Sequence, residues 1–157
     1  MTSLAKVIVV GGGPAGIMAA LSSAKNNEVT LIERNKEIGM KLRLTGGGRC
    51  NITNNRDIEE FFDKIVNNKK FLYSALYTFS NYSLLEYLSN NGLEYKVELD
   101  EKVYTKSDKA DEVIELLKLS VKKYKQTLIM ITHDINIALQ ADRVITIEDG
   151  IIKSDEV

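Results

Sequence analysis

The sequence predicts an α/β fold built on a parallel sheet, and three features near its beginning carry this prediction. Leu4–Val10 is a short apolar run that ends at glycines, which is typical of a buried parallel strand. Pro14–Lys25 is small and apolar, so a helix is expected there, and Glu28–Ile32 is a second apolar run. Together they give strand, turn, helix and strand within about 30 residues, which is the size of a βαβ unit.

The middle of the chain predicts a long loop followed by helices. Residues 33–55 show little periodicity and hold several glycines, so we expect an ordered loop of the kind that usually serves a function. Three helices are expected next, with Gly92 closing the third as its C-cap. The predicted helices cover 57–67, 70–79 and 83–90, and the side chains expected to face inward from the first are Phe61, Phe62, Ile65 and Val66.

The last third predicts an alternation of strands and helices. Two short strands are expected to form a hairpin around Asp100-Glu101, and Ser107 can cap the helix that follows, with Val113, Leu116 and Leu117 on one face. The predicted elements, in order, are strands at 93–99 and 102–105, a helix over 108–122, a strand at 127–132, a helix over 135–141, and strands at 143–148 and 150–153 joined through Asp149-Gly150.

Length and composition bound the class of protein. A chain of 157 residues suggests one domain, or one domain and a fragment. Hydrophobic residues make up 44% and charged residues 27%, the balance of a globular protein with a core. The net charge of −1 gives no indication of nucleic acid or of an acidic membrane as partner, and no apolar run reaches the roughly 18 residues needed to span a bilayer. A single cysteine, Cys50, excludes an internal disulfide and suits a reducing cytoplasm.

A glycine motif and a later acid predict a dinucleotide site. Residues 11–16, Gly-Gly-Gly-Pro-Ala-Gly, satisfy G-x-G-x-x-G between a strand and a helix, and Glu33 ends the next strand 17 residues after Gly16. Gly11 permits the tight turn, Gly13 lets the backbone approach a pyrophosphate, and Gly16 lets helix and strand pack closely. The helix N-terminus, opened by Pro14 and Ala15, would face the phosphates. Glu33 can accept hydrogen bonds from ribose hydroxyls, and its charge would repel a 2′-phosphate, so the motif favours an ADP moiety. The alternative is a glycine-rich turn that binds nothing.

A second region is both basic and rich in glycine. Residues 34–56 hold six Lys or Arg and one acid, and eight of the ten glycines lie between positions 11 and 48. Such a stretch suits a bound polyanion, because the backbone can come close and the side chains neutralise charge. The segment GMKLRLTGGGRCNITN (39–54) looks like a backbone cradle with Arg49, Asn51 and Asn54 as polar anchors.

Residues 4–118 resemble the N-terminal part of the BaiN-type NAD(P)/FAD-dependent oxidoreductases, a family of bacterial flavoproteins. The resemblance rests on VIVVGGGPAGIMAA, on IERNKEIGMKLRLTGGGRCNITN and on KVYTKSDKADEVIELL, where Tyr104 and Thr105 replace the Phe and Pro of the family. It implies a Rossmann-like three-layer FAD/NAD(P)-binding domain. This domain is expected to be truncated, because the family's later Ala-Thr-Gly strand and its flavin-covering segment are not found in the sequence.

The resemblance also implies roles for individual residues. The ADP half of FAD would be held at Gly11, Gly13, Gly16 and Glu33, with NAD(P)H as the reductant. Arg34 would flank the adenine or stay a solvated charge. Cys50, near a flavin, would have a redox role or be a small packed residue. The residues implied toward the pyrophosphate and flavin are Lys41, Thr45, Gly46, Gly47, Arg49, Cys50 and Asn51. The sequence predicts no metal site.

Residues from about 112 to 157 resemble a different family, the ATPase subunits of ABC transporters of the lipoprotein-export and macrolide-export types. The matching stretch contains TLIMITHDINIALQADRVITIEDG, and by resemblance His133 would be the switch residue that contacts the γ-phosphate. The partners of that chemistry are absent from the sequence: it has no G-x-x-x-x-G-K-[ST] loop, no Leu-Ser-Gly-Gly-Gln and no apolar strand ending in Asp-Glu-Pro. We therefore expect no ATPase activity and no catalytic duty for His133.

The two resemblances meet at Glu112–Lys118, so the chain looks like a join of two origins. The hypothesis divides it into an FAD-binding part, 1–118, and an ATPase-like α/β segment, 119–157, whose strands at 127–132 and 143–148 would take places in the same sheet. The function expected is that of an FAD-binding flavoprotein fragment with impaired or no turnover. The alternatives are an inactive ABC ATPase fragment and a non-catalytic module that binds the ADP moiety.

Overall fold

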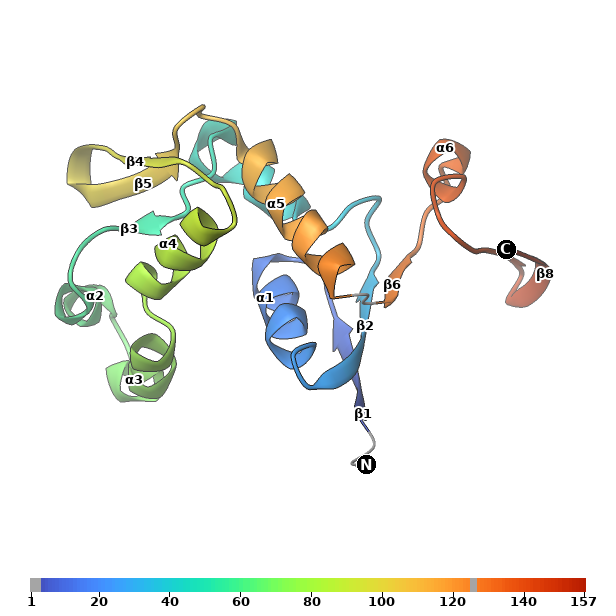
Figure 1. Cartoon of the computed structure of the whole chain (residues 1–157), viewed down its shortest axis with the longest axis horizontal. Coiled ribbons are helices and arrows are strands. Elements are labelled where there is room, and N and C mark those ends of the chain that lie inside the picture. Colours follow the sequence, from blue (N-terminus) through green and yellow to red (C-terminus); the bar gives the residue numbers. More distant parts are fainter. Residues whose placement is uncertain (1–3, 125–126) are drawn as a thin grey trace. The chain divides into compact units, whose positions relative to one another are not determined.

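The computed structural model describes residues 4–124 and 127–157, which form two compact units (Figure 1). Unit one joins Met1–Ile38 with Gln126–Val157, and unit two is Gly39–Lys125. The two expected parts of different origin divide at residue 118 instead, inside a helix of unit two, so that division remains a hypothesis about origin.

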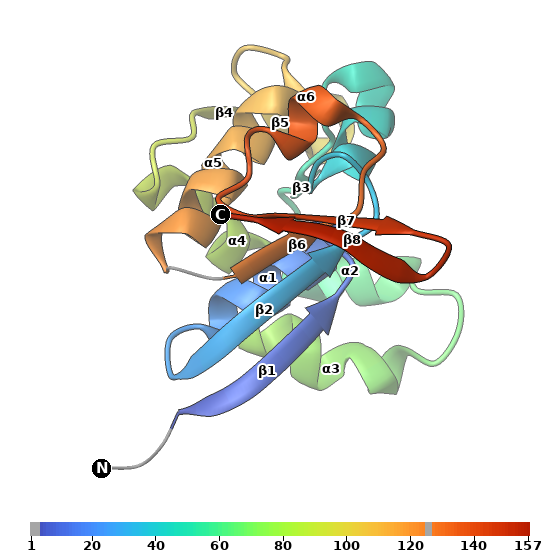
Figure 2. The same ribbon diagram turned by 90° about the vertical axis from the view of Figure 1, so that its right-hand side faces the viewer.

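The sheet of unit one is parallel and carries the βαβ unit that the sequence predicts. Strand β1 (Ala5–Val10) leads through helix α1 (Pro14–Ser23) to strand β2 (Asn27–Glu33). Strand β6 (Thr127–Met130) pairs in parallel with β2, so the strand order is β1-β2-β6 (Figure 2). Because all three strands run the same way, their carboxyl ends meet at one edge of the sheet, the edge at which open α/β sheets bind ligands.

Strand β6 takes the place in the sheet that was expected of it, but the same prediction for the following strand is wrong. Strand β7 (Val144–Glu148) pairs with β8 (Ile151–Glu156) in a separate two-stranded sheet, after the short helix α6 (Ile135–Ala138). The two residues between these strands, Asp149 and Gly150, have φ of 51° and 76°, the left-handed conformation of a tight hairpin turn. Such a turn keeps β8 next to β7, so local pairing costs little chain entropy.

The two faces of the parallel sheet differ in burial. Helix α1 packs against β1 and β2, and the β2 side chains Val29 and Leu31 are buried. Ile8, Val10 and Ile129 belong to the alternate set of side chains, which faces the other side of the sheet, and they are exposed. Within the described residues no layer covers that face, so the expected three-layer arrangement is not seen in full.

Unit two is built around a small antiparallel sheet with helices. Its strand order is β3-β5-β4. Part of the expected long loop, Met40–Gly48, forms 3₁₀ turns that are interrupted by a kink at Thr45, Gly46 and Gly47. The remaining elements are β3 (Thr53–Asn54), α2 (Ile58–Lys64), α3 (Lys69–Thr78), α4 (Asn81–Asn90), β4 (Tyr95–Val97), a 3₁₀ turn at Leu99–Glu101, β5 (Lys102–Thr105) and α5 (Ala110–Lys123).

Two expectations for unit two are wrong in detail. Val66 is exposed rather than inward, because α2 ends at Lys64 and Val66 lies beyond it. Ser107 does not cap the helix α5. The N-cap position is Lys109, whose N–H donates to the hydroxyl of Thr105 at 2.9 Å in place of a serine cap. The residue Gly92 does follow α4 as predicted, with φ of 91° and its N–H donating to the Ser89 carbonyl.

Helix α5 is amphipathic, as the sequence predicts, and it runs without interruption through the region where the two resemblances meet. Its first turn contains two acids and its last turn two lysines, which complements the helix dipole. Its buried side chains lie on both sides of position 118: Val113, Ile114, Leu116, Leu117, Ser120 and Val121.

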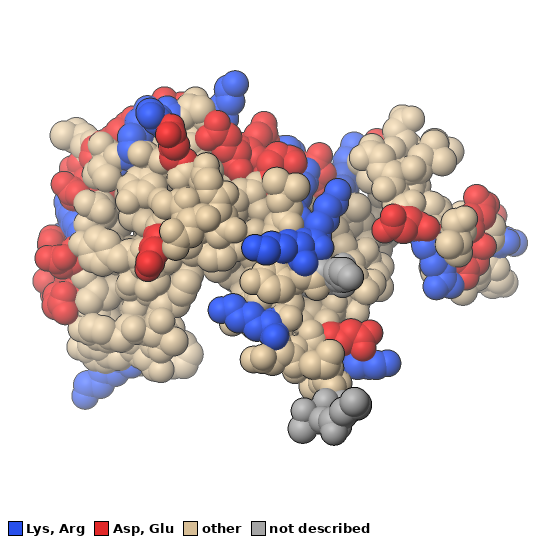
Figure 3. All heavy atoms as spheres, viewed as in Figure 1, with Lys and Arg blue, Asp and Glu red and all other residues tan. Residues whose placement is uncertain are grey.

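Figure 3 shows acidic and basic residues interspersed over the face in view. In the ranges 4–124 and 127–157, no helix is both long and apolar enough to cross a bilayer.

Candidate functional site

Three loops meet at the carboxyl edge of the parallel sheet in unit one. They follow β1, β2 and β6, and backbone hydrogen bonds hold them in place. The N–H of Gly11 donates to the Ile32 carbonyl at 2.8 Å, and the N–H of Ile131 donates to the Glu33 carbonyl at 3.1 Å. This edge therefore brings the glycine motif, Glu33 and the segment after β6 together.

The glycine motif leaves open space in front of helix α1. Gly13 is the N-cap residue, with φ of −76° and no side-chain cap, and Pro14 stands at the first helical position. A Cβ atom built on Gly13 would meet nothing within 4 Å. The first N–H groups of the helix have no partner within it, so they are available to an anion that approaches through this space.

Gly16 has a different role in the same motif. A Cβ atom at this position would lie 1.8 Å from the carbonyl oxygen of Gly11. Helix α1 therefore packs closely against the end of β1 and the turn that follows it, which is the kind of contact predicted for the third glycine of the motif.

The motif leaves Gly12 unspecified, yet its backbone is hydrogen-bonded to Glu33, the acid at the end of β2. We call this contact the Gly12–Glu33 clasp. The N–H of Gly12 donates to Oε2 of Glu33 at 2.5 Å, and a Cβ atom on Gly12 would lie 3.0 Å from that same oxygen. Sequence reasoning missed this contact, because any residue fits the motif at this position.

The Glu33 carboxylate is buried and accepts three hydrogen bonds. Besides Gly12, both the backbone N–H and the side-chain amide of Asn35 donate to it, at 2.7 and 2.6 Å. The backbone N–H of Arg34 interacts with the same carboxylate. Burial raises the pKa of Glu33, but the hydrogen bonds from Asn35 and Gly12 outweigh it and hold the pKa below its usual value.

The lowered pKa of Glu33 makes its contribution to stability dependent on pH. We expect Glu33→Gln to lower the free energy of unfolding by about 1–3 kcal/mol at neutral pH, because an amide nitrogen cannot accept the donated hydrogen bonds. Since the folded pKa is depressed, this contribution is present above the unfolded pKa and is lost as the pH falls through the folded one. Urea unfolding at about pH 7 and about pH 3 measures the change.

The exposed Glu28 on the same strand offers a matched control, and Glu28→Gln should leave stability nearly unchanged at both pH values. A difference between wild type and Glu33→Gln that stays constant from neutral to acid pH would contradict the assignment of the hydrogen-bonded carboxylate.

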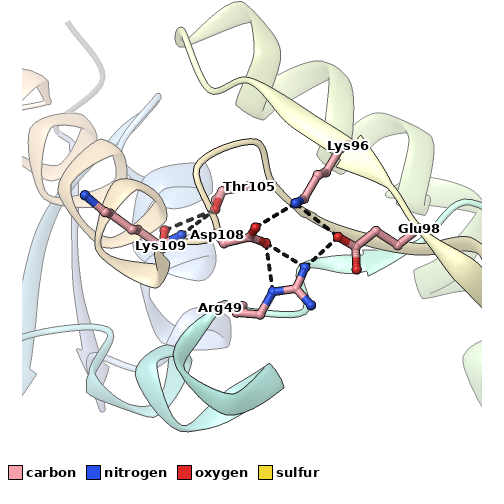
Figure 4. Close-up of polar contacts among 6 residues, drawn as sticks. All are labelled: Arg49, Lys96, Glu98, Thr105, Asp108 and Lys109. Atoms are coloured by element: carbon pink, nitrogen blue, oxygen red, sulfur yellow. Dashed lines mark hydrogen bonds and ion pairs between the residues drawn. The ribbon is translucent and has the colours of Figure 1, made fainter.

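Unit two holds a ring of alternating charges next to the second glycine cluster (Figure 4). Arg49 donates to Asp108 at 2.7 Å and to Glu98 at 2.6 Å, and Lys96 pairs with the same two acids at 2.7 and 3.1 Å. The Arg49 guanidinium also lies 4.1 Å above the ring of Tyr104. Hydrogen bonds from Lys96 and Arg49 hold the pKa of Asp108 below its ordinary value, and those from Arg49 and Lys96 do the same for Glu98. The expected polar anchor Arg49 is thus engaged with carboxylates that sequence reasoning missed.

The second glycine cluster is exposed and left-handed. Gly46, Gly47 and Gly48 have φ of 58°, 66° and 93°, a conformation that favours glycine. A Cβ atom on Gly46 would lie 2.9 Å from the ring of Tyr104, whereas Gly47 and Gly48 face open space. The cluster therefore rests on Tyr104 at one end and presents bare backbone at the other.

The other residues expected near a flavin also lie in unit two, apart from Arg34, which is exposed in unit one directly after β2. Lys41 and Asn51 are exposed, and the Thr45 hydroxyl donates to the Leu42 carbonyl at 2.8 Å. Cys50 differs from them because it is fully buried.

The burial of Cys50 predicts an unreactive thiol. Loss of solvent raises its pKa, which a hydrogen bond with Thr45 only partly offsets, and the thiolate is the reactive form. In native protein at neutral pH, we expect labelling by a chromogenic disulfide reagent to be at least about tenfold slower than in denatured protein. Labelling at equal rates in the two states would contradict a packed role and favour a redox one.

The ATPase-like histidine lies at the edge of unit one. His133 follows β6 and is exposed, and its neighbour Asp134 forms an ion pair with Lys36 at 3.5 Å. In the described part of the chain, no group of three or more His, Cys, Asp or Glu side chains is placed to hold a metal ion.

Comparison with known proteins relates nearly the whole chain to a described family. A model of the HI0933-like protein Rossmann domain matches residues 5–157. A 3-dehydro-bile acid delta(4,6)-reductase of Clostridium scindens is 32% identical over 124 residues, covering 76% of this chain and 29% of the relative. A ribosomal RNA dihydrouridine synthase of Haemophilus influenzae is 28% identical over 131 residues, covering 83% of this chain and 32% of the relative. The chain thus spans less than a third of the length of these relatives.

Similarity to transporter ATPases is shorter. A putative ABC transporter ATP-binding protein of Mycoplasma genitalium is 44% identical over 50 residues, covering 32% of this chain and 16% of the relative. The family model extends to the last residue of the chain, so a join of two origins remains a hypothesis.

Proposed function

The chain belongs to the HI0933-like Rossmann-domain family, and from this premise we propose that it binds FAD as a domain of the flavin-dependent oxidoreductase type. The observation that carries the proposal is the open space at Gly13, in front of α1 and beside the clasp between Gly12 and Glu33. An ADP moiety fits these groups: the pyrophosphate would lie against the helix N-terminus, and a ribose hydroxyl would donate to Glu33.

The choice of FAD rests on the relatives. Those described above are named as a reductase and as a dihydrouridine synthase, and both names denote a reduced product. Bound FAD supplies hydride chemistry, and NAD(P)H would be its reductant. Turnover by this chain is expected to be impaired or absent.

By the family resemblance, the exposed second glycine cluster, with Lys41, Thr45 and Asn51, is expected toward the pyrophosphate and flavin. All of these residues belong to unit two, so this role remains a prediction from the resemblance. Arg49 would act on the cofactor through this loop, which it joins to Glu98 and Asp108. Cys50 would contribute packing, and Arg34 in unit one would flank the adenine.

Reconstitution tests the proposal. Purified chain is incubated with FAD, passed through a desalting column and heated to release the ligand, which is identified by chromatography. We expect yellow protein with about one FAD per chain. Folded protein that emerges colourless would contradict the proposed function.

A second candidate function is a module that binds ADP-containing molecules in general. It is favoured by the fact that every contact described at the edge of unit one suits the ADP half alone. Calorimetry with ADP, NAD and FAD separates the two candidates: tighter binding of FAD supports the flavoprotein, and equal affinity for all three supports the general module.

ATP hydrolysis by this chain is not proposed. The sequence lacks both the G-x-x-x-x-G-K-[ST] phosphate-binding loop and the apolar strand ending in Asp-Glu-Pro that phosphoryl transfer in ABC ATPases needs. We expect no ATPase activity, and activity that disappears in His133→Ala would contradict this.

A further inference from the structure

The strand order indicates in which direction the proposed nucleotide would extend along the edge of the sheet. The pyrophosphate would lie at the turn after β1, and the ribose at Glu33, the last residue of β2. The next strand along the edge is β6. Neighbouring strands are about 4.8 Å apart, so β6 ends roughly 10 Å from β1, a distance comparable to the length of an adenosine phosphate. A base that continues in the same direction arrives at the loop after β6.

That loop is fixed against the loop after β2. The N–H of Ile131 donates to the Glu33 carbonyl at 3.1 Å, and Asp134 forms an ion pair with Lys36 at 3.5 Å. The two anchors enclose Thr132 and His133, so both residues lie at the end of the sheet edge where the base is expected.

Local hydrogen bonds leave His133 as the available side chain of this loop. The Thr132 hydroxyl accepts the N–H of Asp134 at 3.1 Å, and the Asp134 carboxylate accepts the N–H of Asn136 at 3.0 Å. His133 itself is exposed, and among the described residues no hydrogen bond or ion pair involves its imidazole.

We infer that His133 recognises the adenine base of the bound nucleotide. The imidazole ring can stack on a purine, and its nitrogens can donate to or accept from the edge of the base. The inference rests on the proposed function, since it assumes that the ADP moiety lies along this edge. It gives the ATPase-like segment a role in binding the base, in place of phosphoryl chemistry.

The test compares a ligand that has the base with one that lacks it. The affinity of the full chain for ADP and for inorganic pyrophosphate is measured by competition with FAD, for wild type, His133→Ala, His133→Phe and Lys153→Ala. We expect His133→Ala to weaken ADP about tenfold, the size typical of one stacked base, and to leave pyrophosphate unchanged. His133→Phe should recover most of the ADP affinity, because a phenyl ring also stacks. Lys153, exposed on β8, is the control, and its variant should match wild type.

Three results would overturn the inference, and they are distinguishable. Unchanged ADP affinity in His133→Ala, with FAD still bound, rejects the role of His133 and leaves the proposed function standing. An equal loss for ADP and pyrophosphate would mean that His133 acts on the phosphates. Failure of the wild type to bind either FAD or ADP would reject the proposed function together with the inference.

Discussion

Gly13→Val should weaken FAD binding by about a hundredfold or more while the protein stays folded. The backbone at Gly13 has φ of −76°, which any residue can adopt, and a Cβ atom there meets nothing within 4 Å. The substitution is therefore not expected to destabilise the fold. A branched side chain would fill the space through which the pyrophosphate approaches the helix N-terminus, and each charge-assisted hydrogen bond lost costs about 1.5–3 kcal/mol.

Ala5→Val is the matched control for this variant. Ala5 is exposed at the opposite end of strand β1, so the same kind of side chain is introduced far from the carboxyl edge. Equilibrium dialysis with FAD should show normal binding by Ala5→Val and almost none by Gly13→Val, with similar thermal midpoints for both. Normal FAD affinity in Gly13→Val would show that the ligand does not approach the backbone here.

Gly16→Ala should have a different effect from Gly13→Val, because it should destabilise the fold itself. The added Cβ atom would lie 1.8 Å from the Gly11 carbonyl oxygen and 3.0 Å from its carbon, and both are backbone atoms. Helix α1 and the turn after β1 would have to move apart, so we expect the free energy of unfolding to fall by about 3 kcal/mol or more. The measurement is the urea midpoint, together with the yield of soluble protein.

The exposed helical position Ala19 provides the comparison for that variant. Ala19→Val adds more volume than Gly16→Ala does, yet it should cost less than about 1 kcal/mol, because only helix propensity is affected. Wild-type stability in Gly16→Ala would disprove the close contact between helix and strand. The variants at Gly13 and Gly16 thus separate the binding role of the motif from its packing role.

Local patterns explain why much of unit one could be predicted. The apolar run of β1, the glycines after it and the small residues of α1 act over a few positions each, so they mark strand, turn and helix directly. The prediction that β6 joins the sheet followed from the same logic, because an apolar strand after a helix fits a parallel sheet. It failed for β7, where a two-residue turn makes the neighbouring β8 the easier partner.

Contacts between distant residues explain most of what the sequence did not reveal. The clasp of Gly12 and Glu33 joins a position that the motif leaves free to an acid 21 residues away. Arg49 meets Glu98 and Asp108 across 49 and 59 residues, and nothing in the pattern of charges identifies these partners. The side chain of Arg49 was therefore expected to face a ligand, whereas the structure shows it bound to carboxylates.

Titrating FAD with the folded chain, and then with an excess of ADP, tests the central claim most directly. The account predicts saturable quenching of flavin fluorescence at about one site per chain, reversed by ADP, because both ligands would occupy the edge formed by Gly11–Gly16 and Glu33. Quenching that does not saturate, or that ADP cannot reverse, would contradict it.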